Sequence, residues 1–182
     1  MSATRFDFEN KVAVVTGAAQ GIGAACVERL ARDGATVALW DIDDALGEAL
    51  AASLEALGRK AIYCHCDVAR KSEVDAALAS TLEAFGRVDA LVNNAGIFKA
   101  ADFLDITEAD WDAVIDVNLK GAFLVAQAVA RAMVAHGGGA IVHMSSVNGV
   151  TAIPTIASYN VSKGGIDQLT RVMALALADH GI

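Results

Sequence analysis

Two residues near the end of the 182-residue sequence, Tyr159 and Lys163, have types and a spacing suited to proton transfer. Four positions separate them, so in a helix their side chains lie on the same face. A free phenol, with a pKa of about 10, is a poor base at neutral pH. A nearby ammonium group favours the phenolate and makes general acid–base catalysis more efficient. In isolation, the same pair is also typical of an ordinary surface contact.

Two further features support a reactive centre. Ser145 and Ser146 close a predicted strand at its carboxyl end, where ligands of open α/β sheets bind. Asn118 lies on the apolar stripe of a long predicted helix, in register with Val114. A buried unpaired amide costs about 1–3 kcal/mol. We therefore expect Asn118 to have a specific hydrogen-bonding role, either catalytic or structural.

A glycine-rich loop could hold phosphate groups. The segment Thr16-Gly-Ala-Ala-Gln-Gly-Ile-Gly23 follows a predicted strand and opens a predicted helix. Gly17 permits a tight turn, Gly21 lets the backbone approach a pyrophosphate, and Gly23 lets the helix pack close to the sheet. The helix N-terminus offers unpaired N–H groups and the positive end of a dipole. This context predicts dinucleotide binding rather than a plain turn.

Asp41 ends the second predicted strand, 18 residues after Gly23, where the adenosine ribose of a dinucleotide should lie. A carboxylate there accepts hydrogen bonds from the ribose hydroxyls and repels a 2′-phosphate. Gln20 adds no positive charge that would offset the repulsion. We therefore expect NAD rather than NADP. The alternative is that Asp41 caps the next helix, although Asp43 and Asp44 are better placed for that.

These residues must be positioned by a doubly wound parallel sheet, because short apolar strands alternate with longer helical stretches. The predicted strands are Lys11–Thr16, Thr36–Asp41, Ala61–His65, Ala90–Asn93 and Ala140–Ser145. The predicted helices lie near Ile22–Arg32, Asp44–Leu57, Glu73–Phe85, Glu108–Ala135 and Ile156–Asp179. No repeat or linker divides the chain, so we expect residues 1–182 to form one Rossmann-type α/β domain of three layers.

Composition excludes several function classes. Apolar residues make up 55% of the sequence, as expected for a sheet buried on both faces. A net charge of −8 argues against a nucleic-acid partner. The sequence lacks an uninterrupted apolar run of the length needed to span a membrane, and its first ten residues do not resemble a signal peptide. We expect a cytoplasmic protein.

Cysteine usage does not suggest a disulfide framework, because the sequence has three cysteines. Cys64 and Cys66 should place both thiols on one side of a strand, with His65 opposite. A metal site there is conceivable, but no second ligand cluster follows. Buried thiols are the stronger prediction.

With these motifs in order, the sequence resembles the short-chain dehydrogenase/reductase family over about residues 8 to 182. The glycine-rich loop matches the family's cofactor loop, and Asn93-Asn-Ala-Gly96 matches its fourth-strand motif. Asn118, Ser146 and Tyr159-Asn-Val-Ser-Lys163 match its catalytic tetrad. The spacing of 13 residues to Tyr159 selects Ser146 rather than Ser145.

The resemblance implies a role for each of these residues. Tyr159 is the proton donor or acceptor at the substrate oxygen, and Lys163 assists it and binds the nicotinamide ribose. Ser146 hydrogen-bonds the substrate oxygen, while Asn118 organises its helix and a water-linked proton relay. Asp67 holds the adenine amino group. The implied cofactor-binding set is Gly17, Gln20, Gly21, Ile22, Gly23, Asp41, Asp67, Val68, Asn93, Ala95, Gly96, Tyr159 and Lys163.

The resemblance also has a gap. In the family, the position of Ile182 leads into a sixth strand, a Pro-Gly turn, a substrate lid and a seventh strand. We therefore expect the sequence to be a piece of a longer enzyme that lacks the lid and final strands.

Three functions remain open on the sequence. The first is an NAD-dependent dehydrogenase of a secondary alcohol, such as a sugar, polyol or similar hydroxylated metabolite, with Asn148 offering a polar group beside Ser146. The second is a 3-oxoacyl-[acyl-carrier-protein] reductase, against which Asp41 and Gln20 argue. The third is a dinucleotide-binding module without catalysis. By the resemblance we also expect a homo-oligomer, a tetramer or a dimer, that acts on a small molecule.

Overall fold

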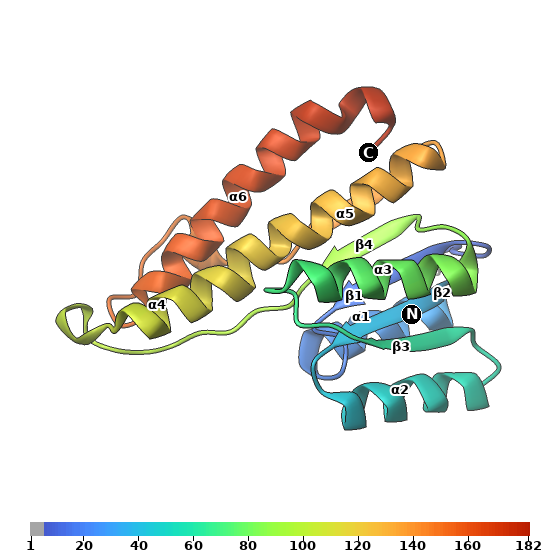
Figure 1. Cartoon of the computed structure of the whole chain (residues 1–182), viewed down its shortest axis with the longest axis horizontal. Helices are drawn as coiled ribbons and strands as arrows, with labels where there is room; N and C mark the ends of the chain where they lie inside the picture. The colour runs from blue at the N-terminus through green and yellow to red at the C-terminus, as the bar shows by residue number, and fades with distance from the viewer. Residues whose placement is uncertain (1–5) are drawn as a thin grey trace, which may run out of the picture.

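Five strands form a parallel sheet at the centre of the computed structural model, which describes residues 6–182 (Figure 1). The strands are β1 (Val12–Thr16), β2 (Thr36–Asp41), β3 (Ala61–His65), β4 (Ala90–Asn93) and β5 (Ala140–His143). Their order is β3-β2-β1-β4-β5. The chain thus runs outward from β1 in one direction and then outward in the other. This is the predicted doubly wound arrangement, and its reversal point lies between β1 and β4.

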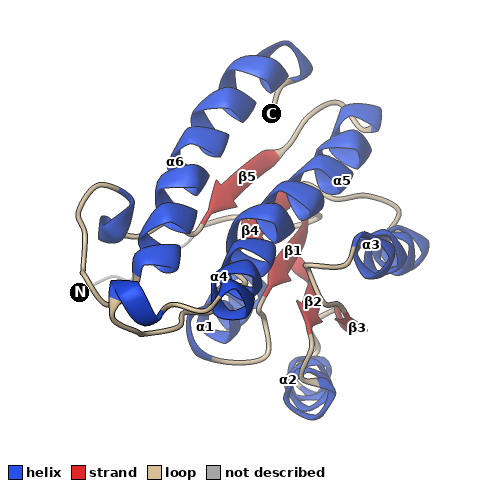
Figure 2. Cartoon of the chain, turned by 60° about the vertical axis from the view of Figure 1, so that its left-hand side comes forward, coloured by secondary structure: helices blue, strands red, loops and turns tan. Residues whose placement is uncertain are grey.

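Helices cover both faces of the sheet (Figure 2). They are α1 (Gly21–Arg32), α2 (Asp44–Ala56), α3 (Lys71–Phe85), α4 (Glu108–Ile115), α5 (Ala122–Ala135) and α6 (Ala157–Leu177). Short helical turns are η1 (Phe103–Asp105), η2 (Asp116–Gly121), η3 (Val147–Gly149) and η4 (Ala178–His180). The alternation of side chains along each strand explains the two faces. Val15 packs with α1 and α2, whereas Val14 packs with α3 and α5.

The predicted helix Glu108–Ala135 is interrupted in the structure. Thr107 caps α4, because its hydroxyl accepts a hydrogen bond from the Asp110 N–H at 3.1 Å. Residues Asp116–Gly121 then form a π-helical turn before α5 begins. A π turn carries an extra residue, and this rotates the side chains relative to a regular helix. Such turns often occur at functional sites.

The predicted strand Ala140–Ser145 was too long, because β5 ends at His143. The Ser145 N–H bonds back to the His143 carbonyl, so the chain leaves the strand direction there. Ser145 and Ser146 consequently lie in the turn beyond the sheet rather than at its last positions. Both thiols predicted to be buried, Cys64 and Cys66, are buried.

Among the described residues, the stretch Glu108–Ala135 is long and apolar enough to cross a membrane by length and composition alone. Val114, Val125 and Met133 from this stretch are completely buried within the protein. The apolar character of the stretch is therefore accounted for by the core of the domain. Residues 1–5, part of the N-terminal segment considered above, lie outside the described residues.

Candidate active site

A cavity of about 740 Å³ opens at the carboxyl ends of the strands. This volume is within the range of about 300–1,000 Å³ typical of small-molecule sites. It brings together most of the residues predicted for cofactor binding and catalysis, namely Gly17, Gln20, Gly21, Ile22, Asp41, Asp67, Val68, Ala95, Gly96, Ser146, Tyr159 and Lys163. Gly23, Asn93 and Asn118 do not line it, and each instead supports its wall.

The loop between β1 and α1 has the conformation that its glycines allow. Gly17 and Gly21 have φ angles of +61° and +58°, which residues with a Cβ rarely adopt. A Cβ at Gly21 would meet nothing within 4 Å, so this part of the loop faces open space. A Cβ at Gly23 would lie 1.9 Å from the Gly17 carbonyl oxygen. Gly23 therefore lets the first turn of α1 pack tightly against the glycine-rich loop. From the sequence, this glycine was expected to bring the helix close to the sheet.

The N-terminus of α1 differs from those of α2 and α4. Gln20 precedes α1 in an extended conformation, and its side chain forms no capping hydrogen bond within the described structure. In α2, by contrast, the Asp43 carboxylate caps the Leu46 N–H. The first N–H groups of α1 are thus left for a ligand, which is the arrangement that favours a bound diphosphate.

Asp41 lies at the cavity end next to this loop, and its carboxylate is held in place from two sides. Oδ2 accepts a hydrogen bond from the Ala19 N–H at 2.8 Å, and Oδ1 accepts one from the Asp43 N–H at 3.0 Å. Each carboxylate oxygen has a second lone pair, so both can still accept from ribose hydroxyls. Asp43, rather than Asp41, caps α2, which agrees with the sequence analysis.

Asp67 and Val68 form the adjoining wall after β3. The Asp67 carboxylate accepts from the Ala69 N–H and lies 3.2 Å from Nε of Arg70, while its own N–H donates to Glu73. Val68 is buried, and a Cβ at Gly121 would approach its side chain to 2.8 Å. Asp67 is therefore held by hydrogen bonds to Ala69, Arg70 and Glu73, and Val68 by close packing against Gly121.

Asn93, expected to line the cofactor, points away from the cavity. It is buried, and its side chain donates to the Ala122 carbonyl at 2.8 Å and accepts from the Thr16 hydroxyl. The neighbouring Asn94 lines the cavity, and its amide donates to the Thr16 and Gly17 carbonyls at 3.0 and 3.2 Å. These contacts join the end of β4 to the phosphate loop. Because side chains alternate along a strand, Asn93 lies on the same face of the sheet as Leu91, the face covered by α5. The orientation of Asn93 away from the cofactor could therefore have been predicted from the sequence.

Asn118 is fully buried in the π turn η2 and has the hydrogen bonds that its burial requires. Its Oδ1 accepts from the Ile97 N–H at 2.8 Å, and its Nδ2 donates to the Ile97 carbonyl at 2.8 Å. Nδ2 also lies 3.1 Å from the hydroxyl of Ser162, which donates to the Tyr159 carbonyl. Asn118 therefore fixes the loop after β4 to helix α6, directly behind the reactive side chains.

The two adjacent serines both line the cavity but have different hydrogen bonds. The Ser145 hydroxyl donates to the Lys163 carbonyl at 3.3 Å, so its proton is used within the protein. The Ser146 hydroxyl accepts from the Asn148 N–H at 3.2 Å. Within the described residues the Ser146 hydroxyl donates no hydrogen bond, so its proton can be donated to a ligand oxygen. This difference favours Ser146, the serine selected by spacing.

Tyr159 and Lys163 project from one face of α6 into the cavity. Nζ of Lys163 lies 5.5 Å from the centroid of the Tyr159 ring and donates to the Met144 carbonyl at 2.6 Å. Burial lowers the pKa of Lys163, while the nearby Asp167 raises it. The edge of the Tyr159 ring also meets Phe98, with 6.4 Å between ring centroids. The site thus has a phenol, an ammonium group and a free hydroxyl at one end.

The combined features fit a nicotinamide dinucleotide. An uncapped helix N-terminus with an open glycine suits the diphosphate, and Asp41 suits an unphosphorylated adenosine ribose. Lys163 and Tyr159 lie at the opposite end, where a second ribose and the nicotinamide would lie. When bound, such a cofactor supplies the hydride acceptor or donor, and the protein supplies position and proton transfer.

Comparison with known proteins agrees with this geometry. The family model for short chain dehydrogenases matches residues 11–182. The chain is 40% identical to a D-threitol dehydrogenase from Mycolicibacterium smegmatis, covering 97% of this chain and 69% of that protein. It is 39% identical to a 3-oxoacyl-[acyl-carrier-protein] reductase from Synechocystis, covering 94% of this chain and 70% of that one.

A solved structure gives the same result for the fold. The crystal structure of a short chain dehydrogenase/reductase from Burkholderia phymatum, in complex with NAD, superimposes with a TM-score of 0.93 at 33% identity. The alignment covers 97% of this chain and 63% of that chain.

Proposed function

The chain belongs to the short-chain dehydrogenase family, and on this premise we propose that it catalyses hydride transfer between NAD(H) and a secondary alcohol or ketone. Oxidoreductase chemistry on alcohol and ketone groups follows from the family. The preference for NAD and the substrate class, a sugar, polyol or similar hydroxylated metabolite, are the parts we add.

One observation carries the proposed preference for NAD. Among the described residues that line the cavity, Lys163 is the only basic one, and it lies at the catalytic end. The adenosine end instead has Asp41 and Asp67, with Asp43 and Asp44 following in the turn into α2. A 2′-phosphate would meet the Asp41 carboxylate there, and the nearby Arg70 is paired with Asp67 at 3.2 Å and does not line the cavity, so repulsion disfavours NADP.

In the proposed reaction, Tyr159 exchanges a proton with the substrate oxygen, and Lys163 stabilises the negatively charged form of the phenol. Ser146 donates its free hydroxyl proton to the same substrate oxygen and orients it. The Asn118 side chain is engaged elsewhere, because its hydrogen bonds within the described residues go to Ile97 and Ser162. We assign it the positioning of α6 relative to the loop after β4.

The proposed substrate class is supported by polar groups beside Ser146 and by one relative. The Asn148 side chain, which lies on η3 next to Ser146, is held by the Thr151 hydroxyl at 3.3 Å. It could select hydroxyl groups near the reacting carbon. The D-threitol dehydrogenase similarity points the same way, because threitol is a polyol.

The test is a two-part assay on the purified protein. NAD and NADP are first titrated in parallel, and a panel of short polyols and secondary alcohols is then screened for formation of NADH. We expect tighter binding of NAD and turnover of at least one polyol. Turnover of a 3-oxoacyl thioester with NADPH, without polyol oxidation, would support the reductase alternative instead. Dinucleotide binding without turnover of any tested substrate would support the binding-module alternative.

The roles of the site residues, the cytoplasmic location and the homo-oligomeric state stay predictions.

A further inference from the structure

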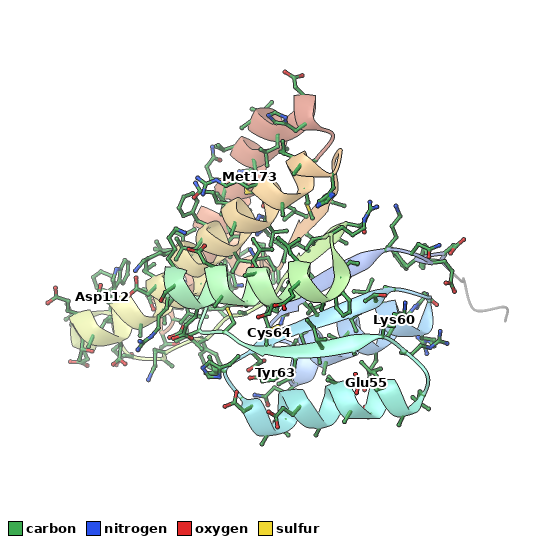
Figure 3. The ribbon with its side chains drawn as sticks, turned by 45° about the vertical axis from the view of Figure 1, so that its right-hand side comes forward. Glu55, Lys60, Tyr63, Cys64, Asp112 and Met173 are labelled. Atoms are coloured by element: carbon green, nitrogen blue, oxygen red, sulfur yellow. The ribbon has the colours of Figure 1, made fainter. Side chains whose placement is uncertain are left out.

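Tyr63, which the sequence analysis did not single out, connects two segments at the adenosine end of the cavity. It lies on the edge strand β3 with its ring turned toward α2 (Figure 3). Its hydroxyl lies 2.8 Å from the Asp41 carbonyl oxygen and 2.7 Å from Oδ1 of Asp44. One O–H can serve these two acceptors only by sharing its proton, so the hydroxyl bridges the end of β2 and the first residue of α2.

Helix α2 is shaped to receive this ring. Gly47 lies within α2, where glycine is less favourable than alanine. A Cβ at Gly47 would approach the Tyr63 ring to 2.2 Å, so a larger residue would displace the ring. Gly47 therefore provides the space that the Tyr63 ring occupies, although glycine lowers the helix propensity of α2.

The segment that Tyr63 holds is the one that presents Asp41 to the cavity. The Asp41 carboxylate is oriented by the Ala19 and Asp43 N–H groups, and its carbonyl accepts from Tyr63 and from the Cys66 N–H. Burial and the Asp44 carboxylate raise the pKa of Tyr63, so its hydroxyl keeps its proton and remains a donor. The hydroxyl is thus protonated across the physiological pH range.

His65, two residues along β3, supports the same turn from the outside. Its Nδ1 lies 2.7 Å from Oδ1 of Asp44, and its Nε2 lies 3.7 Å from Oε2 of Glu73 on α3. Glu73 in turn accepts from the Asp67 N–H. The N-terminal turns of α2 and α3, which follow the two carboxylates at the adenosine end, are therefore linked through one side chain of β3.

We propose that Tyr63, assisted by His65, is a positioning residue that sets the affinity for the adenosine half of the dinucleotide and the discrimination against a 2′-phosphate. It acts through Asp41: by holding the turn between β2 and α2, it keeps the carboxylate where ribose hydroxyls meet it. This inference rests on the proposed function, because it takes Asp41 as the ribose acceptor. It concerns binding and leaves the proton-transfer step at Tyr159 unaffected.

The experiment is calorimetric titration of ADP-ribose and of nicotinamide mononucleotide into the wild type and Tyr63→Phe. Loss of one hydrogen bond of this kind should weaken ADP-ribose binding about fivefold. Binding of nicotinamide mononucleotide should stay unchanged, and KM for NAD should rise without a change in kcat. Ser53→Ala, which removes an exposed hydroxyl from α2 that bonds only locally to Leu50, is the matched control and should leave both ligands unaffected.

Gly47→Ala is the second variant, because it keeps the Tyr63 hydroxyl but displaces its ring. It should weaken ADP-ribose binding in the same way, and the displaced ring should also lower the Tm of the protein. His65→Ala should weaken ADP-ribose binding about twofold, since exposed pairs contribute little. His136→Ala, at an exposed site after α5, is its control.

Two results would overturn the inference: ADP-ribose binding equal to that of the wild type in Tyr63→Phe, or an equal loss for both half-ligands. The second would indicate a general structural defect. The proposed preference for NAD fails separately, if the wild type binds NADP as tightly as NAD. The comparison of ADP-ribose with nicotinamide mononucleotide tests the role of Tyr63 in either case.

Discussion

The catalytic end and the adenosine end of the cavity differ in how deeply their polar side chains are buried and in the groups that these side chains bond to. At the catalytic end, Asn118, Ser162 and Lys163 are almost completely buried, and their polar atoms bond mainly to backbone groups of the loop after β4, of the segment after β5 and of α6. At the adenosine end, Asp41, Asp44 and His65 are partly or largely exposed. Asp44 bonds to His65 across a helix end and a strand end, while Asp41 accepts from backbone N–H groups of the loops after β1 and β2.

This difference predicts how each end of the cavity should respond to substitutions. Buried groups bonded to the backbone hold one geometry, and losing one leaves unsatisfied partners. Exposed carboxylates and a histidine are screened by solvent, so each contributes modestly and can be altered in steps. We therefore expect large effects on turnover and folding at the catalytic end and graded effects on affinity at the adenosine end.

The largest effect should come from Tyr159→Phe, which removes the proton donor and keeps the ring against Phe98. We expect kcat to fall by about 10²–10⁴-fold, the usual contribution of general acid–base catalysis. Titration should show NAD affinity close to that of the wild type. Turnover retained in this variant, on the alcohol that the wild type oxidises fastest, would contradict the assigned mechanism.

The next largest effect should come from Asn118→Ala, because it leaves the Ile97 N–H and carbonyl without their side-chain partner. We expect the free energy of unfolding to fall by about 3 kcal/mol, measured by denaturant titration. Ser162→Ala, which removes a neighbouring hydroxyl, should cost about 1 kcal/mol. Equal stability of Asn118→Ala and the wild type would mean that the two ends of the cavity do not differ as described.

A smaller effect should come from Asp41→Ala combined with Ile42→Arg, both at cavity-lining positions. Removal of a carboxylate and addition of a cation should shift the ratio of NADP to NAD affinity by about tenfold, equivalent to about 1.4 kcal/mol. Parallel titrations of the two cofactors measure this ratio. Ile42→Arg alone is the control that separates the two charges. Unchanged affinities for both cofactors would refute the role of Asp41.

The smallest effect concerns pH and His65, whose pKa is raised by its hydrogen bond to Asp44 and by the charges of Asp44, Glu73 and Asp67. A raised pKa means that the protonated form favours the folded state, so the stabilisation is complete below a pH of about 6.5 and is lost as the pH rises through the folded pKa. The Tm difference between the wild type and His65→Gln should thus be largest below that pH, at about 1 °C. A difference that grew with rising pH would contradict the sign.

Much of the fold could be predicted from the sequence, because local patterns determine it. Buried strands such as Val12–Thr16 are nearly continuous apolar runs, and Thr107 is a residue type that indicates the start of a helix, here α4. The π turn at Asp116–Gly121 could not be predicted, since Asn118 and Gly121, although unfavourable inside a helix, do not by themselves specify a π turn. The contact that this turn makes, between Asn118 and Ile97, joins residues 21 apart in the sequence and is visible only in the structure.

The candidate site was predictable where a motif carried it and hidden where tertiary contacts did. Tyr159, Lys163 and the glycine loop follow fixed spacings, so their meeting in one cavity was expected. The bridge made by Tyr63 depends on the sideways packing of β3 against Gly47 of α2, which no spacing reveals.

The most direct measurement of the central claim is a crystal structure of the protein with NAD bound. The account predicts the adenosine ribose hydroxyls on the Asp41 carboxylate, the diphosphate at the first N–H groups of α1, and the nicotinamide ribose beside Lys163 and Tyr159. A dinucleotide bound in the reverse direction, or with its adenosine ribose away from Asp41, would contradict the division of the cavity into these two ends.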